Sequence, residues 1–370
     1  MPDTRTVHSV VGPLGDPDDN GLRLPDGFTS RIVARSGIPP VPDIDYVWHD
    51  APDGGATFPA DDGGWIYVSN SEMSDGRGGV GALRFGSDGA LLSAYSILNG
   101  TNRNCAGGPT PWGTWLSCEE TPTGSVWECD PTGSNEAVVR PALGIFQHEA
   151  AAVDVANRHI YLTEDEFRGC FYRFTADGAT DGRLDLTSGI LEVAQVIGGP
   201  EGPVIWRKVR DPLAREEPTR RQVSRSTKFK GGEGAWFHNG TVYFTTKHDN
   251  RVWAYDTEEA ILEIVYDEDS FRNVILSVVD NITVSKTGIL YVAEEKGDMQ
   301  IVMIDRFREV APIVQIVGHP RSEVTGPAFD PSGTRLYFSS QTGPRDDPSD
   351  GVTFEMQGPF DRFDTLGPDA

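Results

Sequence analysis

The chain has 370 residues, with 56 Asp and Glu against 32 Lys and Arg and a formal net charge of −24 at pH 7. This charge argues against a nucleic-acid partner, because phosphate backbones are bound by clustered Lys and Arg, and no apolar run is long enough to span a bilayer. The 42 Gly, the 26 Pro and the lack of a sustained helical period predict one all-β domain with many turns. The acidic excess is explained by solubility, by carboxylates that hold hard cations such as calcium, or by both.

The two ends of the chain, 1–45 and 350–370, are rich in Pro, Asp and Gly, and we expect them to wrap or close the fold. The N-terminal residues lack an apolar core and a twin arginine, so no signal peptide is predicted. The expected location is therefore cytoplasmic, and the alternative is an exported protein whose leader is missing from this sequence.

An internal repeat organises the rest of the chain. Each copy is an aromatic residue, an apolar residue and a small residue, followed by polar or acidic positions, and the aromatic residues are Tyr67, Trp115, Tyr161, Tyr243, Tyr291 and Tyr337. Successive copies lie 48, 46, 82, 48 and 46 residues apart, which matches the period of about 40–50 residues typical of propeller blades. The spacing predicts a six-bladed β-propeller with a long insertion, residues 175–230, between blades three and four. The basic stretch 207–230 in this insertion is expected to form a surface loop or a small cap.

Each copy follows a hairpin turn and an earlier short strand of small and apolar residues, as expected for the innermost strand of a blade. In an antiparallel hairpin, the start of the first strand and the end of the second lie at the same end. The residues at these two positions should therefore converge on one face. They are Cys105, Glu149, Glu233, Asp280 and Glu323 at the strand starts, and Glu119, Glu164 and Glu294 at the strand ends.

Crowded carboxylates raise one another's pKa, and burial adds to the effect, so this face predicts bound cations. Oxygen ligands suit calcium, magnesium or manganese, whereas a thiolate among carboxylates suits a transition metal such as iron. His148 precedes Glu149, and strand alternation would turn it to the opposite side, which leaves a role in the site or in packing open. Cys118 and Cys129 are candidates for a disulfide, although four cysteines are too few for a disulfide-built fold.

Several motifs resemble the PhoX-type alkaline phosphatase family, and the resemblance extends from about Ala51 to the end of the chain. The most specific is NCAGGPTPWGTWLSCEE at 104–120; the others are HEAAAVD at 148–154, YLTED at 161–165, GEGAWF at 232–237, DNITVS at 280–285 and TGPAFDPSGTRLYFSSQ at 325–341. The resemblance implies a six-bladed propeller with a cluster of two ferric ions, bound by a cysteine thiolate, and two or three calcium ions, bound by glutamates. The implied metal ligands are Cys105, Glu119, Glu149, Glu164, Glu233, Asp280 and Glu294.

The implied reaction is metal-assisted hydrolysis of a small phosphate ester by a monomer that binds neither nucleic acid nor membrane. One position departs from the family pattern: Gly231 stands where an arginine that reaches the substrate phosphate is expected. Lys228, Lys230, Lys247 or Lys296 is a possible substitute. The predicted catalytic residues are thus Cys105, Glu149, Glu233, Lys230 and Lys247.

Two other functions fit the same residues. One is a calcium-dependent propeller hydrolase of another ester or of a lactone. The other is a non-catalytic propeller in which the metal ions only stabilise the fold and the faces bind partners.

Overall fold

The computed structural model describes residues 10–271 and 274–369. Its regular structure is almost entirely antiparallel β, with a few 3-10 helices. These helices are η1 (Pro141–Leu143), η2 (Thr219–Arg221), η3 (Lys247–Asp249), η4 (Glu268–Ser270), η5 (Pro348–Asp350) and η6 (Phe360–Leu366). The chain forms two compact units: unit 1 comprises Met1–Ser69, Leu83–Tyr95 and Glu268–Ala370, and unit 2 comprises Asn70–Ala82 and Ser96–Asp267.

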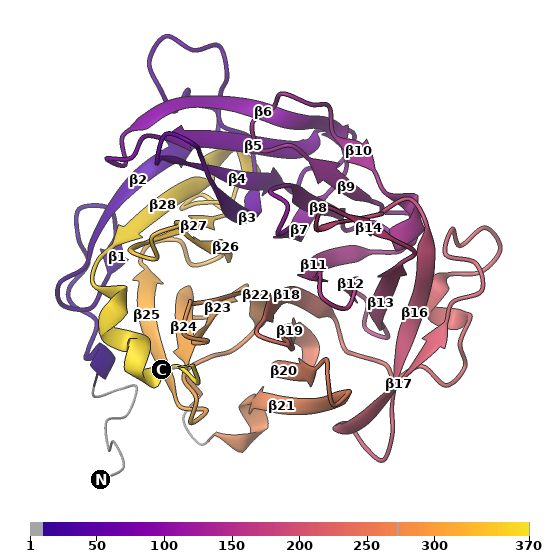
Figure 1. The fold of residues 1–370 in the computed structure, drawn as a ribbon. Helices are drawn as coiled ribbons and strands as arrows, with labels where there is room; N and C mark the ends of the chain where they lie inside the picture. Colours follow the sequence, from indigo (N-terminus) through magenta and orange to yellow (C-terminus); the bar gives the residue numbers. More distant parts are fainter. Residues whose placement is uncertain (1–9, 272–273, 370) are drawn as a thin grey trace. The chain divides into compact units, whose positions relative to one another are not determined.

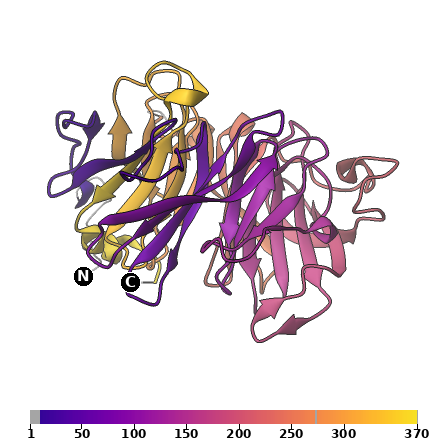
Figure 2. The same cartoon turned by 90° about the horizontal axis from the view of Figure 1, so that it is seen from above.

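Unit 1 contains two complete sheets, whose strands from the C-terminal part of the chain are orange and yellow in Figure 2 and whose strands β1 and β2 are indigo. The first has the order β1-β25-β24-β23-β22 and the second the order β2-β28-β27-β26. Their strands are β1 (Leu22–Arg23), β22 (Val279–Val284), β23 (Leu290–Glu294), β24 (Gln300–Ile304), β25 (Val310–Ile316), β2 (Thr29–Arg35), β26 (Val324–Phe329), β27 (Arg335–Ser340) and β28 (Val352–Gln357).

Unit 2 contains a four-stranded sheet of order β10-β9-β8-β7 and a nine-stranded sheet of order β11-β12-β13-β16-β17-β21-β20-β19-β18, together with the ribbon β14-β15 (Figure 1). The strands of the first sheet are β7 (Asn104–Pro109), β8 (Trp115–Glu119), β9 (Val126–Cys129) and β10 (Val138–Val139). Those of the other two are β11 (His148–Asp154), β12 (His159–Glu164), β13 (Phe171–Ala176), β14 (Ala179–Thr180), β15 (Arg183–Leu184), β16 (Gly189–Val196), β17 (Gly202–Lys208), β18 (Gly232–His238), β19 (Thr241–Thr246), β20 (Arg251–Asp256) and β21 (Ile261–Asp267).

One further four-stranded sheet has the order β3-β4-β5-β6. Its strands are β3 (Pro52–Pro59), β4 (Trp65–Ser71), β5 (Gly78–Phe85) and β6 (Leu91–Thr101). All six copies of the sequence repeat lie on the second strand of a hairpin: β4, β8, β12, β19, β23 and β27. The protein is therefore all-β with a propeller-like arrangement of sheets, as the sequence predicts.

The six copies of the repeat do not lie on six separate sheets in the described part of the chain, because two of them share the nine-stranded sheet. The join lies at β17, where Gly202 pairs with Leu262 and Pro203 with Ile261 of β21. Strands β16 and β17 both come from the 175–230 insertion, which adds alternating apolar residues such as Leu191 and Val193 to the buried face. The insertion thus supplies outer strands to a sheet, and its basic stretch 207–230 begins at the end of β17.

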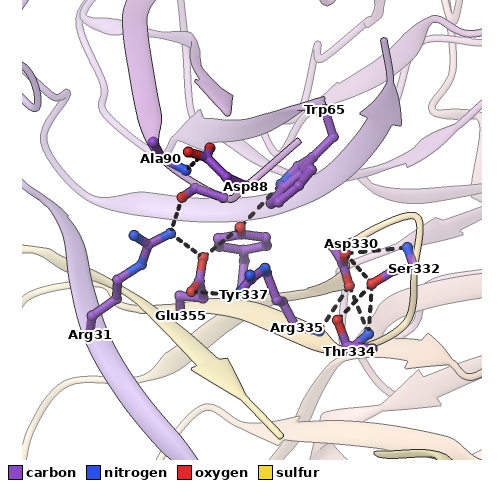
Figure 3. A network of polar contacts seen from close by, with 11 residues as sticks. Arg31, Trp65, Asp88, Ala90, Asp330, Ser332, Thr334, Arg335, Tyr337 and Glu355 are labelled. Atoms are coloured by element: carbon purple, nitrogen blue, oxygen red, sulfur yellow. Dashed lines mark hydrogen bonds and ion pairs between the residues drawn. The ribbon is translucent and has the colours of Figure 1, made fainter. Parts of the chain in front are cut away.

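A polar network joins β2, β27 and β28 to the turn after β5 and to β4 within unit 1 (Figure 3). Arg31 donates to the carbonyl of Gly89 (2.7 Å) and to Glu355 (2.6 Å). The Tyr337 hydroxyl, which is one of the repeat aromatics, donates to Glu355 (2.7 Å) and accepts from the Trp65 indole (3.1 Å). The repeat aromatic therefore packs in the core while its hydroxyl satisfies a buried carboxylate.

Among the described residues no two cysteines form a disulfide, and all four are buried. The register of β8 and β9 explains why Cys118 and Cys129 stay apart, since Cys118 lies opposite Val126 and Cys129 lies opposite Trp115. The described part of the chain holds no helix with the length and apolar character that crossing a membrane requires.

Candidate metal centre

A β-bulge interrupts the start of the inner strand in five hairpins. In β11, for example, His148 pairs with Glu164 but Ala151 pairs with Leu162, so the inner strand holds one extra residue. The same shift occurs in β7 after Asn104, in β18 after Gly232, in β22 after Val279 and in β26 after Thr325. A bulge bends the strand and re-aims the side chains within it. In four of these strands, the residue directly after the paired residue that precedes the bulge is a predicted ligand. These residues are Cys105, Glu149, Glu233 and Asp280.

Small polar side chains of the repeat hold the bulges in place. The Thr163 hydroxyl accepts the N–H of Ala150 (3.0 Å) and donates to the carbonyl of Glu233 (2.5 Å), so it links the bulges of β11 and β18. The Asn70 side chain donates to the carbonyls of Cys105 (3.0 Å) and Ala106 (2.8 Å). These contacts give the small residue of the repeat a physical role, because a buried bulge would otherwise leave backbone groups unsatisfied.

Within unit 2 the bulges bring a thiol and two carboxylates together. One ligand atom each from Cys105, Glu120 and Glu149 lies within 4.8 Å of the others. Glu149 is fully buried and Glu120 is 5% exposed. A buried sulfur beside two carboxylates is a donor set suited to a transition-metal cation, with oxygen ligands that also suit calcium.

The electrostatics of Glu120 support the same interpretation. Desolvation by burial, followed by repulsion from Glu72 and Asp165, raises the pKa of Glu120 to about 9. Arg103 opposes this shift, since it forms ion pairs with both Glu72 (2.6 Å) and Glu120. One guanidinium does not balance the carboxylates gathered here, so the donor set fits a bound cation.

Arg103 reaches these carboxylates from a left-handed backbone conformation (φ 45°) just before β7. Its N–H donates to the carbonyl of Met73 and its carbonyl accepts from the N–H of Glu120, both at 2.8 Å. Such strained conformations persist only where the surroundings hold them, and they concentrate at functional sites. Sequence analysis missed Arg103 because nothing in the repeat marks it.

Lys247 forms a second charged group in unit 2. Its Nζ lies 2.9 Å from Glu233 and 3.0 Å from Asp165, and its side chain is 20% exposed. Gly231, where the resemblance implies an arginine, adopts φ +73°, and a Cβ there would lie 3.0 Å from His248, 3.1 Å from Asp165 and 3.2 Å from the Lys247 side chain. The backbone conformation favours glycine at this position, and Lys247 occupies the adjacent space.

The three glutamates that end the second strands accept hydrogen bonds from the backbone. Each binds the N–H of the residue six positions later: Glu119 binds Ser125 (3.2 Å), Glu164 binds Cys170 (3.0 Å) and Glu294 binds Gln300 (3.1 Å). Their other oxygens accept from the N–H of Asn102, from Arg220 and from the N–H of Ser277, respectively. These carboxylates fasten the loop after each strand, and in the Cys105 group the participating carboxylate is Glu120 rather than the predicted Glu119.

The remaining predicted residues are a buried histidine, two exposed lysines and two acids of unit 1. His148 is fully buried, stacks on Phe146 (3.6 Å between centroids) and bonds the carbonyl of Gly144 through Nε2 (3.0 Å), and burial lowers its pKa to about 4. Lys230 is exposed, and Lys296 is 68% exposed beside Glu295.

Asp280, in unit 1, is buried and accepts from the Asn281 amide (2.9 Å). Glu323, also in unit 1, is partly buried just before β26.

Similarity to known proteins bears on this site. The family model for alkaline phosphatase PhoX matches residues 69–128 and 122–343. The solved structure of Pseudomonas fluorescens PhoX in complex with vanadate, a transition state analogue, is similar to the chain, with a TM-score of 0.74 and 16% identity over 94% of this chain and 97% of that one. No curated protein matches the sequence significantly.

Other solved structures share the fold at lower similarity. A gluconolactonase from Xanthomonas campestris has a TM-score of 0.52 and 13% identity over 94% of this chain and 98% of that one. A Bacteroides thetaiotaomicron protein of unknown function has a TM-score of 0.55 and 8% identity over 89% and 76%. At these identities the likeness concerns the fold alone.

Proposed function

Because this chain belongs to the alkaline phosphatase PhoX family, we propose that it is a metal-dependent phosphoesterase that hydrolyses a small phosphate ester. The observation that carries the proposal is the approach of Cys105, Glu120 and Glu149 to within 4.8 Å of one another in a buried, acidic environment. The residues that bring this group together come from the family motifs at 104–120 and 148–154.

In this proposal Cys105, Glu120 and Glu149 hold metal ions, with iron at the thiolate and calcium at the carboxylates. Glu233 and Asp280 are further proposed ligands, since each lies within the bulge of its inner strand. When bound, the cations would neutralise charge on the phosphoryl oxygens and favour attack by an oxygen nucleophile.

The chain's own residues prepare the site. Arg103 holds Glu72 and Glu120 in fixed positions through its ion pairs. Lys247 does the same for Glu233 and Asp165, and it supplies a positive charge near the position where the family pattern has arginine. Lysine offers a point charge rather than a bidentate fork, so contact with a phosphate dianion would be weaker than with arginine.

The proposal also includes six blades in one propeller. The nine-stranded sheet would then count as two blades that are joined edge to edge at β17 and β21. This count agrees with the six copies of the repeat and gives each blade one inner strand, of which β7, β11, β18, β22 and β26 are bulged.

The test is a panel of phosphomonoesters, phosphodiesters and lactones, assayed with freshly purified protein whose metals are quantified by elemental analysis. We expect turnover of a phosphate ester, iron and calcium in the protein, and loss of both activity and iron in Cys105→Ser. Full activity without metal, or turnover of lactones alone, would overturn the proposal. Metal without any turnover would favour a non-catalytic propeller.

A further inference from the structure

A cationic pocket of about 490 Å³ lies in unit 2, between the loop that follows β12 and the chain around η2. Four cations line it, Arg168, Arg220, Arg221 and Lys228, and the acidic lining residue is Glu166. This concentration of positive charge is unexpected in a chain with a formal net charge of −24. A concave surface with one sign of charge attracts ions of the opposite sign.

Two of the cations are anchored by contacts within the protein. Arg220 binds Glu164 (3.1 Å) and Glu166 (2.7 Å), and its side chain is 17% exposed. The Lys228 ammonium donates to the sulfur of Cys170 (3.1 Å) and to the carbonyl of Arg220. These contacts fix one wall of the pocket. Neither acceptor of Lys228 in these two contacts is a carboxylate.

The other two cations are available to a ligand. Arg168 and Arg221 are exposed, and neither forms an ion pair with any residue of the described ranges 10–271 and 274–369. Like charges that share a pocket repel one another unless an anion lies between them. Guanidinium groups bind phosphate or carboxylate through paired N–H donors, so the pocket is suited to an oxyanion.

The pocket shares a loop with the candidate metal centre. Asp165, which Lys247 binds, is followed directly by Glu166 of the pocket, and the carbonyl of Glu166 accepts the N–H of Gly231 (3.0 Å). Phe167 is 64% exposed, and its ring lies 5.6 Å from that of His248, the neighbour of Lys247. An exposed ring at this point offers an apolar surface between the two charged groups.

We propose that this pocket binds a second anionic group of the substrate, so that the preferred substrates are phosphoesters carrying a further phosphate or carboxylate. This inference rests on the proposed phosphoesterase function for its substrate class. The pocket binds the group that is not hydrolysed, and it favours such substrates through binding rather than through the chemical step.

The kinetic test compares fructose 1,6-bisphosphate with fructose 6-phosphate in the metal-loaded enzyme. The double variant Arg168→Gln/Arg221→Gln should lower kcat/KM for the bisphosphate about tenfold, mainly through KM, and leave the monophosphate within about twofold, as expected for the loss of charge-assisted contacts. Arg225→Gln is the matched control, because Arg225 is exposed on the same segment but does not line the pocket. An equal loss for both substrates, or for neither, would overturn the proposal.

A binding test uses phosphonates, which are not hydrolysed and therefore report on the pocket even if the protein proves inactive on phosphate esters. The double variant should weaken calorimetric binding of p-xylylenediphosphonate about tenfold and leave benzylphosphonate unchanged. Inorganic phosphate is the third probe, since loss of its binding together with unchanged diphosphonate binding would identify a free-phosphate site and contradict the proposal. Absence of phosphoesterase activity with the expected binding pattern would refute the proposed function alone.

Discussion

The adjacent residues Glu119 and Glu120 have different roles at the end of β8. Glu119 accepts the N–H groups of Asn102 (3.0 Å) and Ser125 (3.2 Å), whereas Glu120 lies with Cys105 and Glu149. Successive residues of a strand point to opposite sides, so a pair of acids at a strand end can divide between a structural role and the ligand role that we propose. Glu164 and Asp165 also differ, since Glu164 accepts the N–H of Cys170 and Asp165 pairs with Lys247.

This division predicts opposite outcomes for two matched substitutions. Glu120→Gln should lower bound metal and activity at least tenfold with little change in Tm, because it removes a charge from the ligand group. Glu119→Gln should retain metal and activity but cost about 1–2 kcal/mol of stability, since charge-assisted hydrogen bonds to backbone N–H groups are weakened. Elemental analysis and thermal unfolding of the two variants distinguish the roles, and metal loss in Glu119→Gln alone would contradict this assignment.

Lys247 is the second residue whose substitution is informative. Lys247→Met should reduce kcat/KM for phosphomonoesters about 10-fold to 100-fold, because a buried charge pair with Glu233 and Asp165 is lost. Lys296→Met is the control, as Lys296 is 68% exposed and pairs at the surface with Glu295. Unchanged kinetics in Lys247→Met would show that Lys247 is not required for substrate binding or for ordering the site.

Among the elements of the fold, the bulged inner strands are the main determinants of the site. β11 and β18 place Glu149 and Glu233 through bulges that share the Thr163 hydroxyl. A hairpin without the extra residue would keep plain alternation, and each acid would point to one face of its sheet. The repeat therefore specifies the hairpin of a blade, and the bulge in its inner strand turns a side chain in a new direction.

Thr163→Val tests the contribution of the bulges. Valine keeps the shape but leaves the N–H of Ala150 and the carbonyl of Glu233 without this hydroxyl, which should cost about 1–3 kcal/mol and lower metal content. Thr180→Val, on the exposed strand β14, serves as the control, because the same substitution at a surface strand should be nearly neutral. Denaturant unfolding with metal analysis checks both, and full metal occupancy in Thr163→Val would show that the bulges hold their shape without the hydroxyl.

At the scale of the whole molecule, charge is the dominant property. A formal net charge of −24 means that the carboxylates of the candidate centre lie in a protein that already repels further negative charge. Bound cations would offset this repulsion locally, and binding to the folded state alone raises stability by mass action.

Removal of metal should therefore destabilise the protein. EDTA should lower Tm by several degrees, since each 1 kcal/mol shifts Tm by about 2–4 °C in a domain of 150–250 residues. Calcium together with iron should restore Tm, while an equal ionic strength of NaCl should not, because buried charges are screened little by salt. An identical Tm before and after chelation would argue against a metal centre in the folded protein.

The sequence alone determined the all-β character, the family and the strands that hold the repeat, because period and turn chemistry are local properties that recur along the chain. It also pointed to Cys105 and Glu149, which the structure places in one group. The tertiary structure decided which neighbouring carboxylate lies in that group, because backbone N–H groups hold Glu119 away from it. It also decided the direction of Cys105 and Glu149, because β7 and β11 each hold one extra residue at this point.

Long-range pairing decided the rest. Strand β17 joins two repeat copies in one sheet, and Arg168 lines one pocket with Arg220 and Arg221, which belong to the 175–230 insertion. Such contacts depend on packing between segments far apart in the chain, which neither composition nor spacing encodes locally.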